Sequence, residues 1–474
     1  MTAEPADGPP AVRAQGAAAA AVATPWIVGA ALFLQSLDAT IVATALPTMA
    51  RDFGLPVVQL NTVVTAYLLT TSLFIPLSGW LSTRFGAKRI FLLAIALFTF
   101  ASLLCGLSQS LPMLVAARCL QGAAGAMLTP IGRILVVQRH GQSDLIRAMS
   151  FLGMCVVLGP VMGPPLGGFI AEYLTWHWLF LINLPIGLIA LWATQRFITE
   201  AADEGQRSID IPGYLLCAAG LGSAVYGLSQ AAEHARPAQW MVPAAVGLAL
   251  LAGYAAYARG RAHAILDLSL LRDTTFAASF AGGIVLRLGV ASSAFLLALM
   301  LQIAYGIDPL SSGLIALSSA ASALAMKAVA RRVIAAVGFR RLLIVNTIVL
   351  SGLLFTWTLF RPDTPLALMV VALFAAGFAR SLQFTTINTL MFSEMKGART
   401  SAASSLSSTA FQFAETLGVS GAAIALSLMN GSDAANPARL DAYTICFGIV
   451  AALHMLPLPL FLRLRHDAGA GLRG

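Results

Sequence analysis

Ionisable side chains stand in the middle of several long apolar stretches of this sequence, where a charge is costly. They are Asp38, Arg118, Arg287, Arg380 and Glu415. At membrane depth an ion normally faces a charged partner or a water-filled cavity, and it often marks an ion or substrate path. Asp38 is therefore interpreted as part of a proton or substrate relay. The alternative is a structural hydrogen-bonding group that braces one helix against its neighbour.

Polar residues accompany these charges. Arg118 and Gln121 are three residues apart, and Arg118 provides a fixed positive charge that stabilises a nearby carboxylate. The later charges have similar neighbours, and we expect a substrate cavity lined by Arg287, Arg380, Gln383, Asn388 and Gln412. The five ionisable residues within apolar stretches comprise three arginines and two carboxylates. This excess of one positive charge favours an anionic or zwitterionic substrate. Alternatively, Glu415 neutralises Arg287 or Arg380 and the substrate is a lipophilic cation.

The composition indicates a membrane protein. Hydrophobic residues make up 58% of the 474 and charged residues only 10%, against about 25% charged in soluble domains. Apolar stretches of about 20 residues recur, which is the length of a helix that crosses the hydrocarbon core. We predict fourteen spans, near 26–47, 61–82, 90–109, 112–134, 147–171, 177–197, 211–229, 240–258, 276–304, 310–330, 342–360, 365–390, 402–429 and 441–462.

The distribution of basic residues predicts the orientation. The net charge is +9, and with a cytoplasmic N-terminus about 20 of the 29 Lys and Arg residues fall in cytoplasmic loops and tails. The positive charge therefore reflects topology rather than nucleic-acid binding, and both termini are expected in the cytoplasm. The five cysteines lie in apolar spans without metal-ligand spacing. No metal site and no cofactor are expected. No phosphate-binding loop is present, which argues against an ATP-driven pump.

Five segments organise the chain. A disordered cytoplasmic tail is expected at 1–25, a six-helix bundle at 26–198, linkers with two extra spans at 199–275, a second six-helix bundle at 276–462, and a cytoplasmic tail at 463–474. The two bundles show a weak internal repeat, because Phe85-Gly86-Ala87-Lys88-Arg89 is echoed by Val337-Gly338-Phe339-Arg340-Arg341. Related halves are typical of alternating-access carriers.

Six stretches together resemble the major facilitator superfamily, and specifically its 14-span drug:proton antiporter branch. They are Leu37–Val42, Gly79–Arg89, Arg118–Gly122, Gly159–Gly168, Trp176–Gly187 and Ile265–Arg272. The likeness covers essentially residues 26–462. It implies an all-α integral membrane fold of the major facilitator type, with two six-helix bundles plus two extra transmembrane helices.

The resemblance also implies roles for residues. It places Arg118 in the proton-coupling machinery. Asp38 and Glu415, as carboxylates at membrane depth, and Gln121, beside Arg118, are expected to share that role. The resemblance further implies a gating loop with Gly79, Arg84, Gly86, Lys88 and Arg89, and an antiporter hinge with Gly159, Pro160, Gly163, Pro164, Gly167 and Gly168. The alternative for the hinge residues is plain helix packing by a small-residue stripe. Thr83 stands where the family has an acidic residue, which argues for a weaker latch at that loop.

The expected function is a proton-coupled exporter in the bacterial inner membrane. Its expected partners are a small-molecule substrate, protons and the lipid bilayer, with no nucleic acid. A monomer suffices for this fold, and cooperation with an outer-membrane efflux system is left open. Two alternatives remain at this point: an uptake carrier or facilitator on the same fold, and a membrane enzyme or sensor that transports nothing.

Overall fold

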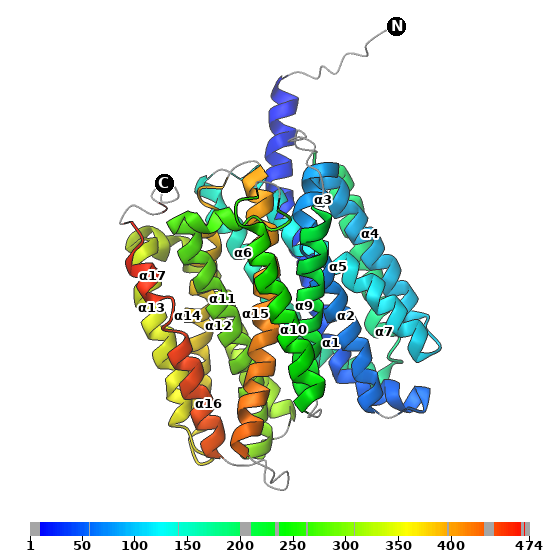
Figure 1. Ribbon diagram of the computed structural model, residues 1–474, viewed down its shortest axis with the longest axis vertical. Helices are drawn as coiled ribbons and strands as arrows, with labels where there is room; N and C mark the ends of the chain where they lie inside the picture. The colour runs from blue at the N-terminus through cyan, green and yellow to red at the C-terminus, as the bar shows by residue number, and fades with distance from the viewer. Residues whose placement is uncertain are drawn as a thin grey trace.

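The computed structural model describes residues 10–55, 57–140, 142–199, 210–232, 237–261, 264–307, 309–395, 398–430, 440–465 and 469 (Figure 1). Helices dominate these residues, and no strand occurs among them. The first half comprises α1 (Pro10–Phe53), α2 (Val57–Phe74), α3 (Leu77–Phe85), α4 (Ala87–Gly106), α5 (Leu111–Arg139), α6 (Gln142–Tyr173), α7 (Trp178–Leu181) and α8 (Asn183–Phe197).

Two helices, α9 (Ile211–Ala232) and α10 (Pro237–Ala258), lie between the halves in the sequence. The second half comprises η1 (Leu268–Arg272), α11 (Thr274–Leu299), η2 (Met300–Ala304), α12 (Pro309–Val337), α13 (Phe339–Phe355), η3 (Thr356–Thr358), α14 (Leu366–Phe392), α15 (Ala398–Asn430), α16 (Leu440–Leu453) and α17 (Leu458–Leu462). Helix α9 packs on α2 and on α15, so it touches both halves, and α10 packs on α9.

The number of membrane crossings is only partly supported by the structure. Among the residues that the structure describes, ten helices are long and apolar enough to cross a membrane, and the bent pair α2–α3 raises the number to eleven. The pair bends by 56° next to Pro76, whose missing N–H interrupts the helical hydrogen bonds. The other three predicted spans correspond to α6, α12 and α15, which are helical but are not among the ten. Fourteen spans therefore remain a prediction.

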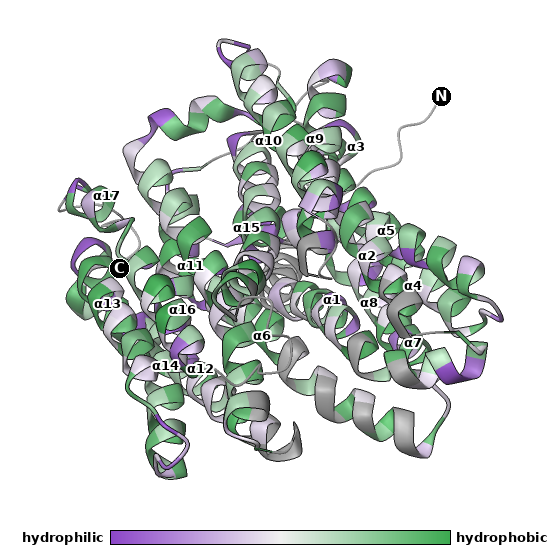
Figure 2. Cartoon of the chain, turned by 60° about the horizontal axis from the view of Figure 1, so that its bottom comes forward, coloured by the Kyte–Doolittle hydropathy of each residue, from purple (hydrophilic) through white to green (hydrophobic). Residues whose placement is uncertain are grey.

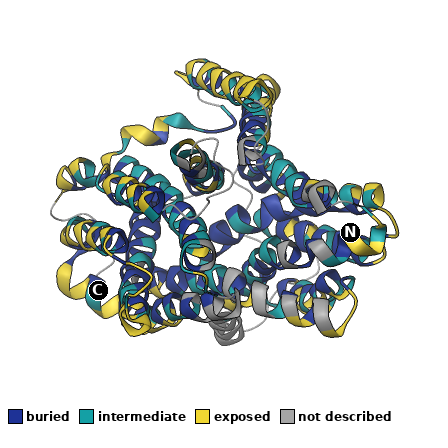
Figure 3. Cartoon of the chain, turned by 90° about the horizontal axis from the view of Figure 1, so that it is seen from below, coloured by how far each residue is buried: buried dark blue, intermediate teal, exposed yellow. Residues whose placement is uncertain are grey.

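The outer surface of the helix bundle is apolar. Apolar residues cover most helices (Figure 2), and exposed positions lie mainly along the outer faces of the peripheral helices (Figure 3). Large hydrophobic side chains such as Trp192, Val242 and Val371 are more than half exposed. In water such a surface would favour aggregation, whereas in a bilayer it would contact lipid chains.

The expected disordered tail at 1–25 differs from the structure. Helix α1 begins at Pro10 and continues without a break into the first predicted span. Residues 17–21 are all alanine, which has the highest helix propensity, so an extension of the helix is physically reasonable. Residues 1–9, 200–209, 466–468 and 470–474 lie outside the described residues, so the tails and the polar linker are described only in part.

The internal repeat appears in the backbone. Gly86 (φ 88°, ψ 136°) joins α3 to α4, and Gly338 (φ 83°, ψ 153°) joins α12 to α13. A positive φ is unstrained only for glycine, which explains why both basic loops carry one at this place. Arg340 donates to the carbonyl of Leu462, so its loop lies beside the end of α17. We call the end of the bundle that carries these two loops the basic end.

Candidate functional site

A buried ion pair forms the centre of the first half. Arg118 on α5 donates through Nη1 to Oδ2 of Asp38 on α1 at 2.6 Å. Both residues have no exposed surface. Two such charges out of water are tolerated only when they are paired and their remaining hydrogen-bonding groups are satisfied. The pair that sequence analysis places at membrane depth is thus a real contact between two helices.

Neutral polar groups complete this ion pair. Gln121 accepts from Arg118 at 2.6 Å and donates to Asp38 at 2.8 Å. Asn183, the first residue of α8, also donates to Asp38, at 2.9 Å. Ser102 on α4 accepts from Gln121 at 2.8 Å and from Asn183 at 3.2 Å. Four helices therefore meet at one carboxylate, and we call these five residues the carboxylate network.

Aromatic rings and a close helix contact enclose the guanidinium of Arg118. The guanidinium carbon lies 4.2 Å from the ring centre of Tyr67 on α2 and 5.8 Å from that of Phe180 on α7. Arg118 Nε donates to the carbonyl of Val63 at 3.4 Å. Gly122 permits this approach of α2 to α5, because a Cβ there would lie 2.6 Å from the carbonyl of Tyr67. The guanidinium is therefore enclosed by protein groups and has no contact with solvent.

The glycine stripe of α6 packs on the part of α1 that bears Asp38. A Cβ on Gly159 would collide with Ser36 and the backbone of Leu37, and one on Gly163 would collide with Thr40. The predicted hinge is thus a close helix contact that sets the position of the carboxylate network. Gly167 is buried in the same helix. The side chains of Pro160 and Pro164, and Gly168, lie outside what the structure describes in detail.

Glu415 lies in a different place from the other predicted coupling residues. On α15, it forms an ion pair with Arg287 on α11, and its side chain is 37% exposed. The guanidinium of Arg287 also lies 4.7 Å from the ring centre of Phe384 and 5.6 Å from that of Phe411. The structure therefore brings Asp38, Arg118 and Gln121 together in the first half, and places Glu415 in a second polar group of the other half.

Three further cations form no ion pair among the described residues, although Glu415 lies near enough to act on Arg133. Arg133 on α5 donates to Ser408 on α15 at 3.5 Å, and Arg380 on α14 donates to Ser319 on α12 at 2.7 Å. Lys327 on α12 donates to Thr385 on α14 at 2.7 Å. All three partners are hydroxyl groups, which do not neutralise charge. With Arg287 and Glu415 paired, the region carries a clear excess of positive charge.

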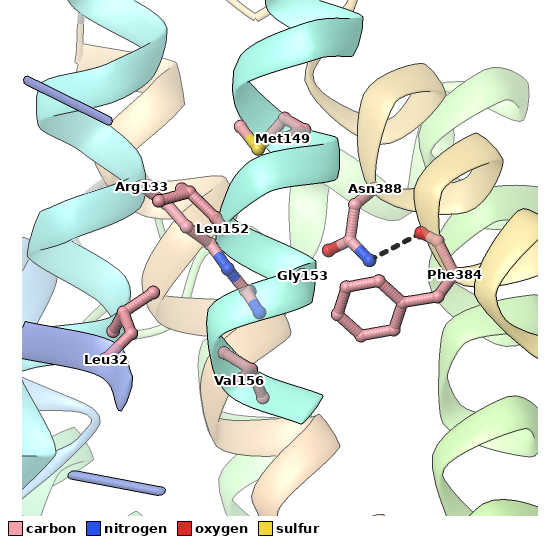
Figure 4. Close-up of a pocket in the computed structure, with 8 residues that line it drawn as sticks. All are labelled: Leu32, Arg133, Met149, Leu152, Gly153, Val156, Phe384 and Asn388. Carbon is pink, nitrogen blue, oxygen red and sulfur yellow. Dashed lines mark hydrogen bonds between the residues drawn. The ribbon is translucent and has the colours of Figure 1, made fainter. Parts of the chain in front are cut away.

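Arg133 also lines a pocket between the two halves. The other lining residues come from α1, α6 and α14: Leu32, Met149, Leu152, Gly153, Val156, Phe384 and Asn388 (Figure 4). Asn388 donates to the carbonyl of Phe384, while its own amide oxygen is buried without a described partner. Asn388 thus lines this pocket, and its part in a substrate cavity stays a prediction.

Gln383, by contrast, makes contacts inside the second half. It accepts from Asn346 and donates to Thr347, both on α13, at 2.8 and 2.9 Å. Gln412 is half-buried on α15. The sequence Arg380-Ser381-Leu382-Gln383 on α14 repeats the pattern Arg118-Cys119-Leu120-Gln121 on α5, and in both cases the glutamine bonds to the preceding helix. The first-half arginine has a carboxylate partner, and the second-half arginine has a serine.

The halves touch at the basic end. Ser405 on α15 donates to the carbonyl of Pro76 at 3.1 Å, and Ser404 donates to that of Pro130 at 2.7 Å. A Cβ on Gly79 would lie 2.9 Å from the Cβ of Ser405, so this glycine of the predicted gating loop is needed for the contact. Lys88 instead bonds to the carbonyl of Gln195 within the first half, Arg84 is exposed, and Thr83 bonds back to Gly79.

Several of these residues were missed by sequence reasoning. Asn183 lies in a motif that carried the family resemblance, yet nothing local indicates that it contacts Asp38, 145 residues away. Arg133 and Lys327 were not among the residues that sequence analysis placed in the cavity. The repeat of Arg-x-x-Gln was a usable signal for pairing α5 with α14. Within the described residues, no group of three or more His, Cys, Asp and Glu could hold a metal ion.

Comparison with known proteins identifies relatives across the chain. The sequence model of the Major Facilitator Superfamily matches residues 28–419. A protein of Klebsiella pneumoniae named MdtD, for multidrug resistance, is 34% identical over 449 residues, covering 94% of this chain and 95% of its own. The MdtD of Pectobacterium carotovorum is 36% identical over 406 residues, covering 85% and 87%. The crystal structure of the human organic anion transporter MFSD10 superposes with a TM-score of 0.68 at 14% identity, covering 93% of this chain and 99% of that one.

Proposed function

Because the chain belongs to the major facilitator superfamily and is a transporter rather than an enzyme, we propose that it is a proton-coupled antiporter. It exports drugs or small amphipathic or anionic organic compounds across the bacterial inner membrane by alternating access. The basic end faces the cytoplasm, with both termini on that side. The multidrug-resistance name of the MdtD relatives and the anion named for MFSD10 both support a small organic substrate.

The observation that carries this proposal is the carboxylate network. Asp38 is a membrane-depth carboxylate with no exposed surface, held by Arg118, Gln121 and Asn183. Protonation of Asp38 would cancel the ion pair and leave Arg118 without a counter-charge, which changes the energy of the contact between α1 and α5 by several kcal/mol. A proton can therefore bias one arrangement of the helices over another.

The contact between the halves supplies the second element of the proposal. Ser404 and Ser405 join α15 to the first half at the basic end, and Gly79 allows α3 to approach. Breaking this contact would open a path from the cytoplasm to the cations between the halves. One proton moved through 100 mV provides about 2.3 kcal/mol, which sustains a substrate gradient of roughly 50-fold.

Purified protein in liposomes would test the coupling. The vesicles contain a pH-sensitive dye, and ethidium or 1-naphthoate is added in the presence and absence of an imposed pH gradient. We expect substrate and protons to move in opposite directions, and we expect Asp38→Asn to abolish proton movement. The matched control is Asp363→Asn, which removes an exposed carboxylate outside the spans.

Two results would contradict the proposal. Substrate flux that ignores the pH gradient would indicate a facilitator, and protons that move with the substrate would indicate an uptake carrier. Unchanged proton flux in Asp38→Asn would remove the carboxylate network from the mechanism.

A further inference from the structure

We propose that Arg133 and Lys327, one from each half, bind the negatively charged group of an aromatic organic anion, and that Phe384 binds its ring. This inference rests on the proposed transport function and names the substrate class and the residues of the same central site. It assigns the charged group to residues other than Arg287 and Arg380, the two basic residues that sequence analysis placed in the cavity.

The pocket places Arg133 at the boundary between the halves. Arg133 is 6% exposed and lines the pocket together with Gly153 of α6 and Phe384 and Asn388 of α14. In Figure 4 the guanidinium extends beside α6 toward the side of the pocket formed by Phe384. Its described hydrogen bond is a long one, 3.5 Å, to the hydroxyl of Ser408. The guanidinium thus faces a space between elements of both halves.

Lys327, on α12 of the second half, lies beside two residues that line the pocket, Phe384 and Gly153. Its ammonium lies 5.6 Å from the ring centre of Phe384. A Cβ on Gly153 would come within 2.9 Å of Lys327 Nζ and 2.8 Å of Phe384 Cε1. The absence of a side chain at Gly153 therefore lets the ammonium and the ring approach α6, the helix that lines the pocket beside Arg133.

The balance of charges around the pocket favours a ligand with a negative charge. Arg287 lies close to this group, but Glu415 neutralises it. Asp38 is likewise matched by Arg118 in the carboxylate network. Arg133 and Lys327 bond to hydroxyl groups and form no ion pair among the described residues. Glu415 also lies near enough to act on Arg133, but it is already paired with Arg287, so one carboxylate faces three cations. A buried charge without a counter-ion is costly, so a carboxylate on the substrate would supply the missing charge and a charge-assisted hydrogen bond.

The ring of Phe384 favours an aromatic group on the ligand. Two cations, Lys327 and Arg287, already lie near this ring, which lines the pocket with Leu32 and Leu152. In this arrangement of the helices the pocket has room for little more than one water molecule. An aromatic ring on the substrate would therefore enter only after the halves move apart, and it would then find an aromatic neighbour and aliphatic walls. The buried amide oxygen of Asn388, which has no described partner, would accept a hydrogen bond from a donor on the substrate. Because the two cations come from different halves, a bound anion would hold the halves together.

Equilibrium binding to the purified full chain in detergent tests the inference. The probes are 1-naphthoate and 1-naphthylmethylammonium, which share a ring system and differ in charge. We expect the protein to prefer the naphthoate, and we expect Arg133→Gln and Lys327→Gln each to weaken naphthoate binding at least about tenfold. The charge-conserving variants Arg133→Lys and Lys327→Arg should stay within about threefold. Arg332→Gln, an exposed charge on the same helix as Lys327, is the matched control.

A preference of the unmodified protein for the ammonium probe would overturn the inference, and this comparison does not depend on whether any variant folds. A loss below tenfold in either glutamine variant that elutes as a single species would remove that residue from the site and overturn the proposal as stated. Equilibrium binding needs no proton gradient. Naphthoate binding can therefore be observed even if transport is not coupled to protons. Conversely, a lack of naphthoate binding would not contradict proton coupling.

Discussion

Neutralising one side of the ion pair between Asp38 and Arg118 should destabilise the protein strongly. Asp38 accepts hydrogen bonds at 2.6, 2.8 and 2.9 Å from Arg118, Gln121 and Asn183. Asp38→Asn keeps the shape but leaves the guanidinium enclosed without its counter-charge. Removing one partner of a buried pair costs about 3–5 kcal/mol, compared with about 0.5–1.5 kcal/mol for an ordinary hydrogen bond.

A double-mutant cycle separates this charge effect from simple loss of packing. Arg118→Gln should cost a similar amount as Asp38→Asn, for the same reason. The double variant has no unpaired charge, so its loss of stability should be smaller than the sum of the two by about 2–3 kcal/mol. The free energy of unfolding is measured by titration with sodium dodecyl sulfate in mixed micelles. Losses that add to within about 0.5 kcal/mol would show that the two charges do not stabilise each other, and the reasoning about the carboxylate network would be refuted.

Three further predictions concern positions outside the ion pair. Gly159→Ala should cost roughly 1–3 kcal/mol, because its Cβ would force α1 away from α6, whereas Gly421→Ala, with open space around it, should be neutral. Ser405→Ala removes a hydrogen bond between the halves. Its effect can be measured with Ser82→Cys, at a buried position, in a variant without the native cysteines: Ser405→Ala should speed alkylation of this cysteine by up to about tenfold, and an unchanged rate would argue against the contact. Tyr254→Phe removes a hydroxyl that bonds to both the N–H and the carbonyl of Leu266, so unfolding should become easier by about 1–3 kcal/mol, and a variant as stable as the native protein would contradict this.

Sequence alone identified the depth of the charges but not most of their partners. Hydropathy places Asp38 and Arg118 inside predicted spans, because each is a charged residue within an otherwise apolar segment. The three-residue spacing also places Gln121 beside Arg118. Ser102 and Asn183 carry no such signal, since serine and asparagine are common at helix ends and in packing. Their role depends on how α4 and α8 stand around α1, which is a property of the fold.

The span count shows a related limit. Helices α6, α12 and α15 lie where spans were predicted but are not among the ten. For α6 and α12 the reason is that neither has 18 consecutive residues whose side chains the structure describes. Helix α15 has a further reason, which is the row of buried serines on its inner face: Ser401, Ser404, Ser405 and Ser408. Two of them, Ser404 and Ser405, bond to the first half. A helix that faces other helices or a cavity does not need an apolar side there, so a hydropathy criterion underestimates it.

The two Arg-x-x-Gln sequences suggest how related halves acquired different tasks. In both, the glutamine ties its helix to the preceding one, Gln121 to α4 and Gln383 to α13. In the first half the arginine meets Asp38 and its charge is cancelled in a closed site, which suits a group that responds to a proton. In the second half Arg380 meets only the hydroxyl of Ser319 among the described residues. Its charge stays available, as do those of Arg133 and Lys327, and this favours an anion between the halves.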